Sequence, residues 1–362
     1  MNMELLDLYS DYLICQNKYS TATGLSALLP QISHDKVSRF LREKDLSSKD
    51  LWNYIKPYIR QIETEKSGIL ILDDTIEEKP HTDQNEIVAW HYSHSKGINI
   101  NGINILSCLV RYGDDVFPIG YEVVHKDTEV IDEKTNKLKR IASISKNEYF
   151  RNLLTTAAKN QVKFEWILAD NWFSSKDNFD FIHKKLKKKF IIGIKSNRLV
   201  ALSQNDKKTG KFQRVDELEL KDGESKILWL KGNSFPMKLT KKIFTNEDGS
   251  TGILFIVSND LTDGVDHSEI YHKRWQIEVY HKSLKQNASP KNHLAKSPTK
   301  TVKTQKNHIF ASVVGFCKLE LLKLKTATNH FAIKYKLILA ANQAALKELN
   351  LLKNTSQIQN FA

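Results

Sequence analysis

Four residues at helical spacing could act together on a phosphate ester. Tyr271, Arg274, Glu278 and Lys285 follow one another at intervals of 3, 4 and 7 residues. At about 100° per residue these intervals place all four side chains within an arc of about 60° on one helix. A carboxylate between an arginine and a lysine suits a metal ligand beside cations that bind phosphate. The alternative is an exposed helix with ion pairs between neighbouring turns.

Two aspartates supply further carboxylates where buried strands are expected to end. Asp74 closes the apolar run from Gly68, and Asp170 follows the apolar run 164–169. Taken alone, an aspartate at a strand end is more often a turn former. With Glu278, however, the two could bind two Mg²⁺ ions about 3.5 to 4 Å apart, an arrangement that cleaves phosphodiesters. Carboxylate oxygens suit Mg²⁺ better than zinc.

The order of these motifs resembles the DDE transposases of bacterial insertion sequences, in the branch with the Tyr-Arg-Glu-Lys signature. The chain reads Asp-Asp-Thr at 73–75, Ala-Asp-Asn-Trp-Phe at 169–173, and then the signature. The resemblance runs from about Gly68 to Glu320. It implies that the acid directly before threonine, Asp74, is the first metal ligand and catalytic residue, with Asp73 as its neighbour. Asp170 and Glu278 are then the second and third.

The resemblance also implies an architecture, a cofactor and DNA contacts. It implies a ribonuclease-H-like core, a β insertion before the last catalytic helix, two Mg²⁺ ions per site that Mn²⁺ can replace, and cut-and-paste movement of DNA. Phosphate contacts fall to Tyr271, Arg274 and Lys285, and nearby cations would stabilise a phosphoryl transition state in any case. Trp275 either packs in the core, the preferred interpretation, or contacts unstacked DNA. Lys79 is either a DNA contact or a plain surface lysine, which is the preferred interpretation.

The lysine-rich stretch after the signature carries a further DNA candidate and one departure from the family pattern. Between His281 and Leu319 there is no acid, and the eight lysines are 282, 285, 291, 296, 300, 303, 306 and 318. This asymmetry favours a surface that contacts phosphates, and Lys282 is a candidate within it. The departure is residues 290–293, which come before Leu294 where the family is expected to run on directly.

Composition agrees with a nucleic-acid partner and excludes several classes of protein. The formal net charge is +13, which attracts polyanions. Three cysteines without CxxC spacing exclude a disulfide framework or a cysteine-based zinc module. No apolar run reaches the ~18 residues of a membrane span, and acids occupy the start where a signal peptide is basic. We expect a cytoplasmic, nucleoid-associated protein.

The apolar pattern predicts a mixed α/β fold built on a ribonuclease-H-like core. Strands are expected at 68–74, 103–110, 116–124, 164–169 and 190–194, and helices at 147–160 and 174–189, giving the order β-β-β-α-β-α-β. Extended runs at 227–230, 237–244 and 252–257 indicate a strand-rich insertion. A helix from Ser268 to about Gln286, capped by Asp266, and helices within 308–352 complete the chain.

These elements predict five segments. They are a helical, candidate DNA-binding segment at 1–62, the first part of the core at 63–196, the β-rich insertion at 197–264, the end of the core with the catalytic helix at 265–320, and C-terminal helices at 321–362. In the first segment, Ser33 is expected to cap a short helix that carries Lys36, Arg39 and Arg42. This is either a helix-turn-helix or an ordinary bundle with a solvated basic face.

Three other patterns are weaker. His91 and His94, beside Trp90 and Tyr92, lack the further ligands of a metal site, so a structural or DNA-facing role is preferred. His308 begins an apolar run and is expected to be a core histidine. No GxxxxGK[ST] loop is present, so ATP-driven transposition is not indicated.

The leading hypothesis is a Mg²⁺-dependent transposase that cleaves double-stranded DNA at the ends of an element and transfers the strand to target DNA. Bringing two ends together requires at least a homodimer. The alternatives are a ribonuclease-H-like nuclease without strand transfer, and a DNA-binding remnant that has lost catalysis.

Overall fold

The computed structural model describes residues 3–16, 20–63, 68–93, 96–133, 136, 138–246, 248–288 and 300–355. Its contacts divide the chain into two compact units. One is Ser48–Val279, and the other combines Met1–Ser47 with Tyr280–Ala362. The five segments expected from the sequence stay predictions.

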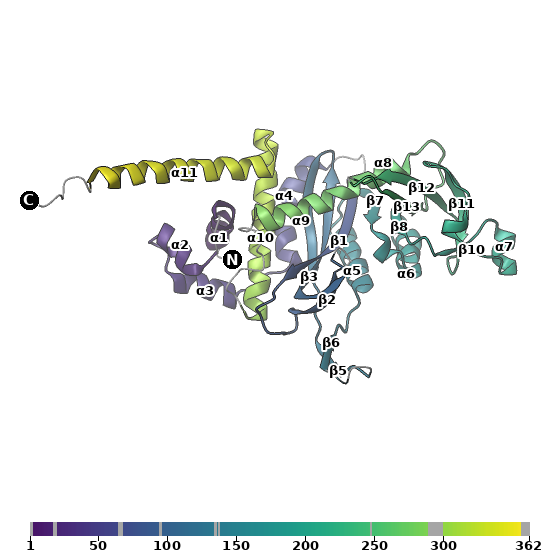
Figure 1. Cartoon of the computed structure of the whole chain (residues 1–362), viewed down its shortest axis with the longest axis horizontal. Coiled ribbons are helices and arrows are strands. Elements are labelled where there is room, and N and C mark those ends of the chain that lie inside the picture. The colour runs from purple at the N-terminus through teal and green to yellow at the C-terminus, as the bar shows by residue number, and fades with distance from the viewer. Residues whose placement is uncertain are drawn as a thin grey trace, which may run out of the picture. The chain divides into compact units, whose positions relative to one another are not determined.

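The larger unit is built on five strands in the order of a ribonuclease-H-like core (Figure 1). Strands β1 (Gly68–Glu78), β3 (Ile98–Tyr112) and β4 (Asp115–Val123) form an antiparallel meander. Strands β7 (Phe164–Ala169) and β8 (Lys189–Ile194) add to its other side, parallel to β1. The order β4-β3-β1-β7-β8 confirms the predicted fold class, and β7 has the predicted bounds.

Strand β1 is longer than the sequence predicted. It continues four residues beyond Asp74, because the first half of β3 pairs with it as far as Glu78. The expectation that the strand ends at the two acids is therefore wrong. A further strand, β2 (Ala89–Ser93), pairs with the first five residues of β3, 98–102, and was not predicted.

The predicted strand-rich insertion is present, and it extends the core sheet. Strand β13 (Thr251–Ser258) pairs with β8, and the sheet then continues through β12 (Met237–Thr245) and β11 (Ser225–Leu230). The short strands β9 (Leu199–Ala201) and β10 (Gln213–Arg214), with helix α7 (Gln204–Thr209), follow. The result is an 11-stranded sheet.

A small hairpin interrupts the core after β4. Strands β5 (Thr128–Ile131) and β6 (Leu138–Ile141) pair only with each other among the described residues. In Figure 1 the hairpin extends away from the sheet.

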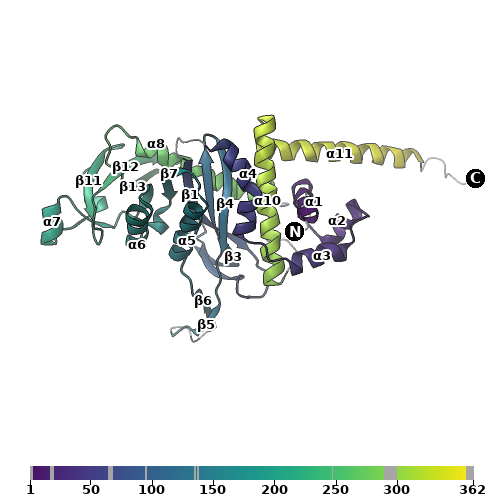
Figure 2. The same cartoon turned by 180° about the vertical axis from the view of Figure 1, so that it is seen from behind.

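Three helices of the larger unit lie against the core sheet. Helix α4 (Ser48–Ile62) packs on β4, and α5 (Lys146–Lys159) packs on β3 and β4. Helix α6 (Lys176–Asp180) continues as a π-helix to Leu186, so the helix predicted over 174–189 is shorter at both ends. Figure 2 shows α5 and α6 in front of the sheet. Residues 70–72 of β1, at the centre of this sheet, are fully buried.

The helix predicted from Ser268 to Gln286 is interrupted. Helix α8 (His267–His272), which contacts β8 and β12, begins at Asp266, whose carboxylate accepts the predicted hydrogen bonds from residues 268 and 269. A 3₁₀ turn (Lys273–Trp275) then precedes α9 (Gln276–Gln286). Because the 3₁₀ turn is tighter than an α-helix, the side chains on either side of it lose the uniform spacing assumed for one continuous helix.

The smaller unit is helical throughout its described part. Helices α1 (Met3–Cys15), α2 (Ala22–Leu28) and α3 (His34–Glu43) pack with α10 (Val302–Thr326) and α11 (His330–Thr355). Ser33 caps α3 as predicted, with its hydroxyl accepting from the backbone of Lys36. The basic residues of α3 are exposed opposite its buried apolar face.

A buried polar chain ties three helices of this unit together. The Ser283 hydroxyl lies 2.8 Å from Nδ1 of His330, and Nε2 of His330 lies 2.8 Å from a Glu320 carboxylate oxygen. Lys323 binds the same carboxylate. Burial opposes ionisation, but the bonds from His330 and Lys323 outweigh it and hold the pKa of Glu320 below its usual value of 4.5.

Glu320→Gln is expected to lower the free energy of unfolding at neutral pH by about 2 to 4 kcal/mol, because it leaves buried donors without their anion. Since the folded pKa lies below the unfolded one, the carboxylate stabilises the fold above about pH 4.5, and this contribution disappears as the pH falls through the folded pKa. Urea unfolding at pH 7 measures the loss of stability, and urea unfolding below pH 4.5 measures how the contribution of the carboxylate disappears. The matched control is Glu348→Gln on the exposed part of α11, and equal stability of the two variants at pH 7 contradicts the expectation.

Candidate active site

Neighbouring strands bring three aspartates to one edge of the core sheet. Asp73 and Asp74 are consecutive in β1, so their side chains leave opposite faces of the sheet. The parallel pairing of β1 with β7 ends at Leu72 and Ala169. Asp73 and Asp170 are thus the next residues on two adjacent strands. This is the edge where the sequence predicted the carboxylates to converge.

On one face, Arg274 connects Asp73 with the signature glutamate. Its Nη1 donates to Oδ2 of Asp73 at 3.0 Å and lies 3.6 Å from Oε1 of Glu278. Burial raises the pKa of Asp73 well above its ordinary value, and repulsion from Asp170 adds to the shift while Arg274 opposes it. Asp73, Arg274 and Glu278 therefore form one charge cluster.

On the other face, Asp74 has two protein partners. Lys146 Nζ lies 3.0 Å from both carboxylate oxygens, and Asn104 Nδ2 donates to Oδ2 at 2.5 Å. Lys146 is the first residue of α5, directly after the cap Ser145. Its ammonium also lies 4.5 Å from the centre of the Trp172 ring. This arrangement places a cation between a carboxylate and an aromatic face.

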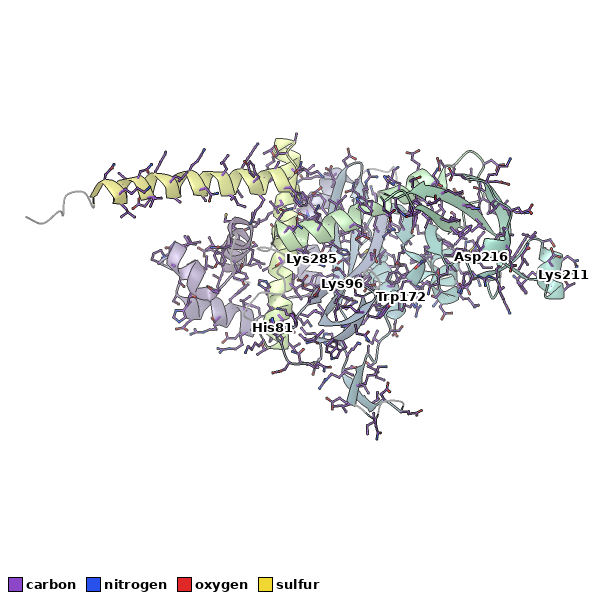
Figure 3. The ribbon with its side chains drawn as sticks, in the orientation of Figure 1. His81, Lys96, Trp172, Lys211, Asp216 and Lys285 are labelled. Atoms are coloured by element: carbon purple, nitrogen blue, oxygen red, sulfur yellow. The ribbon has the colours of Figure 1, made fainter. Side chains whose placement is uncertain are left out.

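Asp170 lies between these two clusters. The backbone N–H of Trp172 donates to its carboxylate at 3.0 Å, which fixes the turn that ends β7. Burial raises the pKa of Asp170, and repulsion from Asp74 adds to this while the charges of Arg274 and Lys146 oppose it. Trp172, two residues further along, is 42% exposed. Its side chain is labelled in Figure 3. Asp170 therefore interacts electrostatically with acids on both faces of β1.

The donor set fits a divalent cation by its chemistry. Asp73, Asp74, Asp170 and Glu278 offer only oxygen, and a cation would relieve the repulsion that helps to raise the pKa of Asp73 and of Asp170. Within the described part of the chain, no group of three or more His, Cys, Asp or Glu residues is arranged to hold a metal ion. Lys146 and Arg274 instead neutralise two of the carboxylates. Ligation by Asp74, Asp170 and Glu278 remains a prediction.

The signature tyrosine is buried and has a structural partner. Tyr271 is 7% exposed, and its hydroxyl donates to the backbone oxygen of Ala169 at 3.3 Å. A Cβ at Gly193 would lie 3.0 Å from this hydroxyl, so the glycine permits its close approach. The Arg274 guanidinium lies 5.7 Å from the Tyr271 ring centre. Tyr271 thus links the signature helix to the end of β7, next to Asp170.

The preferred interpretations of two other residues are wrong. Trp275 is 61% exposed, so it does not pack in the core, because the neighbouring positions Tyr271 and Ile277 form the buried side of this segment. Lys79 is 3% exposed and is not a surface lysine, and burial lowers its pKa to about 8. Asn101 of β3 hydrogen-bonds to both the backbone N–H and the backbone oxygen of Lys79. In this structure Lys79 offers no surface to DNA.

The lysines after the signature differ in their exposure and in their partners. Lys282 is exposed, with Nζ 5.3 Å from the Phe331 ring centre, and Lys285 is partly buried seven residues after Glu278 on α9. Lys318 binds Asp7 and Asp11, each at 2.7 Å. Residues 290–293, Lys291 and Lys296 lie outside the described residues.

The histidines singled out in the sequence have different surroundings in the structure. His308 is buried and hydrogen-bonds to the Tyr9 hydroxyl, which confirms a core histidine. Burial lowers the pKa of His91 to about 4, with repulsion from Lys126 and Lys146 adding to it. Trp90 and Tyr92 are exposed on either side of His91. His94 lies outside the described residues.

Sequence reasoning missed Lys146 and Asn104 and gave Asp73 only as the neighbour of Asp74. Strand alternation alone could have shown that Asp73 and Asp74 lie on opposite faces of the sheet. Asp73 is therefore not only the neighbour of Asp74 but takes part in the site through its own ion pair with Arg274. The cap at Ser145 predicts a helix start at Lys146, but not what lies opposite it. Asn104 carried no signal, because its role depends on the register between β3 and β1.

Comparisons with known proteins agree with these motifs. A family model described as DDE superfamily endonuclease matches residues 2–214, and one described as Transposase DDE domain matches residues 135–302. No curated protein matches the chain.

Among solved structures, the Drosophila P element transposase strand transfer complex is similar at 14% sequence identity and a TM-score of 0.24. The similarity covers 51% of this chain and 36% of that chain, so the match spans well under half of that protein. None of the helices in the described ranges is long and apolar enough to cross a membrane. The family model described as DDE superfamily endonuclease matches more than half of this chain, and the matched residues include Asp73, Asp74 and Asp170. The chain therefore belongs to the DDE superfamily endonucleases.

Proposed function

We propose that this protein is a DNA transposase of the Tyr-Arg-Glu-Lys branch found in bacterial insertion sequences. It cleaves double-stranded DNA at the terminal inverted repeats of an element and joins the freed 3′-hydroxyl to target DNA. The observation that carries the proposal is the electrostatic cluster of Asp73, Asp74, Asp170 and Glu278 at one edge of a ribonuclease-H-like sheet.

Asp74, Asp170 and Glu278 are the proposed ligands of two Mg²⁺ ions, which Mn²⁺ can replace. Such ions supply activation of a water and stabilisation of the leaving oxygen. The chain itself supplies positioning, because Tyr271 ties the signature segment to β7 and Arg274 holds Glu278 near Asp73. Arg274 and Lys285 are proposed to bind phosphates near the cleaved end, where positive charge favours the transition state. Trp275 and Lys282, both exposed, are further candidates for DNA contact.

The experiment that tests this function separates cleavage from joining. A labelled duplex ending in the DNA that flanks the gene, with a free 3′-hydroxyl, is incubated with a target plasmid, the full chain and Mg²⁺. Label joined to plasmid is the expected result. Mg²⁺-dependent nicking without joined product supports the nuclease alternative, and binding of the duplex without either reaction supports the catalytically inactive remnant.

A homodimer is proposed because two element ends must react together, and helix α11 offers a self-complementary surface for it. Seven residues of α11 follow the coiled-coil spacing of alternating four and three residues and so form one row along the helix, the seam. They are Phe331, Tyr335, Ile338, Asn342, Ala345, Leu349 and Leu352. Leu349 and Leu352 are exposed, which is unusual for apolar residues in one row. Asn342 interrupts the row at an a position, where the same amide of a second copy is its natural partner.

Leu349→Lys is therefore expected to weaken self-association at least about tenfold, since it places like charges opposite each other in the seam. Light scattering over a concentration series measures the change. Lys347→Gln, an exposed substitution off the seam, is the matched control. A parent protein that stays monomeric at high concentration with DNA contradicts the proposal.

A further inference from the structure

We propose that Lys146 is a phosphate-binding residue of this site, which neutralises Asp74 while no metal ion is bound and changes partner to a DNA phosphate when one binds. This inference rests on the proposed function, because it takes Asp74 as a metal ligand. It adds a residue outside the three acids and the signature, from a helix that supplies none of them.

The geometry shows a cation in the position where a metal ion would compete. Lys146 Nζ is equidistant, at 3.0 Å, from both oxygens of Asp74. Asp74 has no other cation within ion-pair distance in the described residues. A divalent ion that ligates Asp74 must share or take these oxygens, since both cations bind by charge to the same atoms. The ammonium and the metal ion therefore bind in competition.

The surroundings of Lys146 suit a change of partner. Its side chain is 26% exposed, so a phosphate oxygen can reach the ammonium without unfolding of the helix. The Trp172 ring, 4.5 Å away, remains as a second partner that keeps the ammonium at the site when the bond to Asp74 is broken. Lys146 is also the first residue of a 14-residue helix, whose N-terminal end favours an anion. A phosphate bound here would therefore be attracted by the Lys146 ammonium and by the positive N-terminal end of α5.

Competition for Asp74 has a thermodynamic consequence. Phosphate and Asp74 compete for Lys146, and Lys146 and the metal ion compete for Asp74. DNA binding therefore frees Asp74 for the metal ion, and metal binding frees Lys146 for DNA, so each ligand must raise the affinity for the other by the same factor. The site would then assemble its metal ions mainly on DNA.

The test measures Mn²⁺ binding to the full chain by electron paramagnetic resonance, with and without a short duplex. Lys146→Met is expected to bind Mn²⁺ about tenfold more tightly than the parent protein without DNA, since a partly buried competing charge is removed. The same substitution should abolish the increase in Mn²⁺ affinity that DNA causes in the parent. Lys146→Arg, which keeps the charge, should retain that increase. Lys159→Met, at the exposed far end of α5, is the matched control.

The outcomes distinguish this inference from the function on which it rests. Mn²⁺ affinity of Lys146→Met within twofold of the parent, while Asp74→Asn binds Mn²⁺ poorly, overturns the role of Lys146 and leaves the metal assignment intact. If Asp74→Asn binds Mn²⁺ as well as the parent, the metal assignment itself fails, and the inference with it.

A second measurement needs no substitution, so it holds even if Lys146→Met does not fold. The salt dependence of DNA binding by the parent protein is compared with and without Ca²⁺, which also prefers oxygen ligands. Release of Lys146 toward a phosphate should steepen the slope of log affinity against log salt by about 1. An unchanged slope overturns the inference.

Discussion

Asp170→Asn and Glu278→Gln are each expected to reduce Mg²⁺-dependent nicking by at least about 10³-fold, because each removes a charged oxygen ligand from a site that must hold metal against a phosphate. Both side chains keep nearly the same volume, so the fold should persist. Single-turnover nicking of a labelled duplex measures the loss, and gel mobility shift of the same duplex should change little. Glu269→Gln, on the exposed first turn of α8, is the matched control. Unimpaired nicking by either variant refutes the assignment.

The two acids of β1 need a sharper version of the same experiment, because removing either one disturbs the other. Asp74→Cys and Asp73→Cys each replace hard oxygen ligands with a thiolate, which binds Mn²⁺ or Cd²⁺ better than Mg²⁺. Asp74→Cys is expected to lose nicking in Mg²⁺ and regain part of it in the softer ions. Asp73→Cys should stay inactive in all three, because its partner is Arg274. Rescue of Asp73→Cys instead transfers the ligand role to Asp73.

The core of the fold was predictable because its strands have an unambiguous pattern. The apolar run from Gly68 to Leu72 is buried on both faces, as expected for a strand at the centre of an α/β sheet. The run 164–169 is buried except at Glu165, and its last residue is followed at once by the turn that Asp170 caps. In such runs the apolar side chains that predict a strand are the same side chains that must be buried in the sheet.

The details of the site depend on pairings between distant residues, which local patterns do not encode. Asp73 meets Arg274 across 201 residues, and Asp74 meets Lys146 across 72. Strand β1 extends past its acids only because β3 is long enough to pair with the extension. Lys79, directly after this extension, is held to β3 by hydrogen bonds of its backbone with Asn101 and is buried, which local patterns also did not indicate.

The local geometry of the signature segment was also hidden. A helical repeat predicts even angular spacing, but the 3₁₀ turn at Lys273–Trp275 tightens the segment that contains Arg274. Arg274 lies on this turn and reaches Asp73, while Trp275 next to it is exposed. Propensity alone does not distinguish a 3₁₀ turn from an α-helical one, because the same residues suit both.

Arg274→Gln is expected to reduce nicking by about 10²- to 10³-fold and to lower the free energy of unfolding by about 2 to 4 kcal/mol. The guanidinium is largely buried, with Nη1 3.0 Å from Asp73 and 3.6 Å from Glu278. Its loss leaves Asp73 buried without a cation, so the pKa of Asp73, already raised by burial and by Asp170, rises further. Single-turnover nicking and urea unfolding measure the two effects. Arg274→Lys, which restores one charge without the planar fork, should recover more stability than activity.

The control for Arg274 is an arginine whose ion pair is exposed. Arg214 binds Asp216 at 2.6 Å on the surface of the same unit, with the two side chains 49% and 33% exposed. Arg214→Gln should leave the urea midpoint and nicking unchanged, since exposed pairs gain little over solvation by water. If Arg274→Gln behaves like Arg214→Gln, then Arg274 neither compensates the buried acids nor acts on the phosphate. The electrostatic account of the site is then wrong, even if the three carboxylates prove essential.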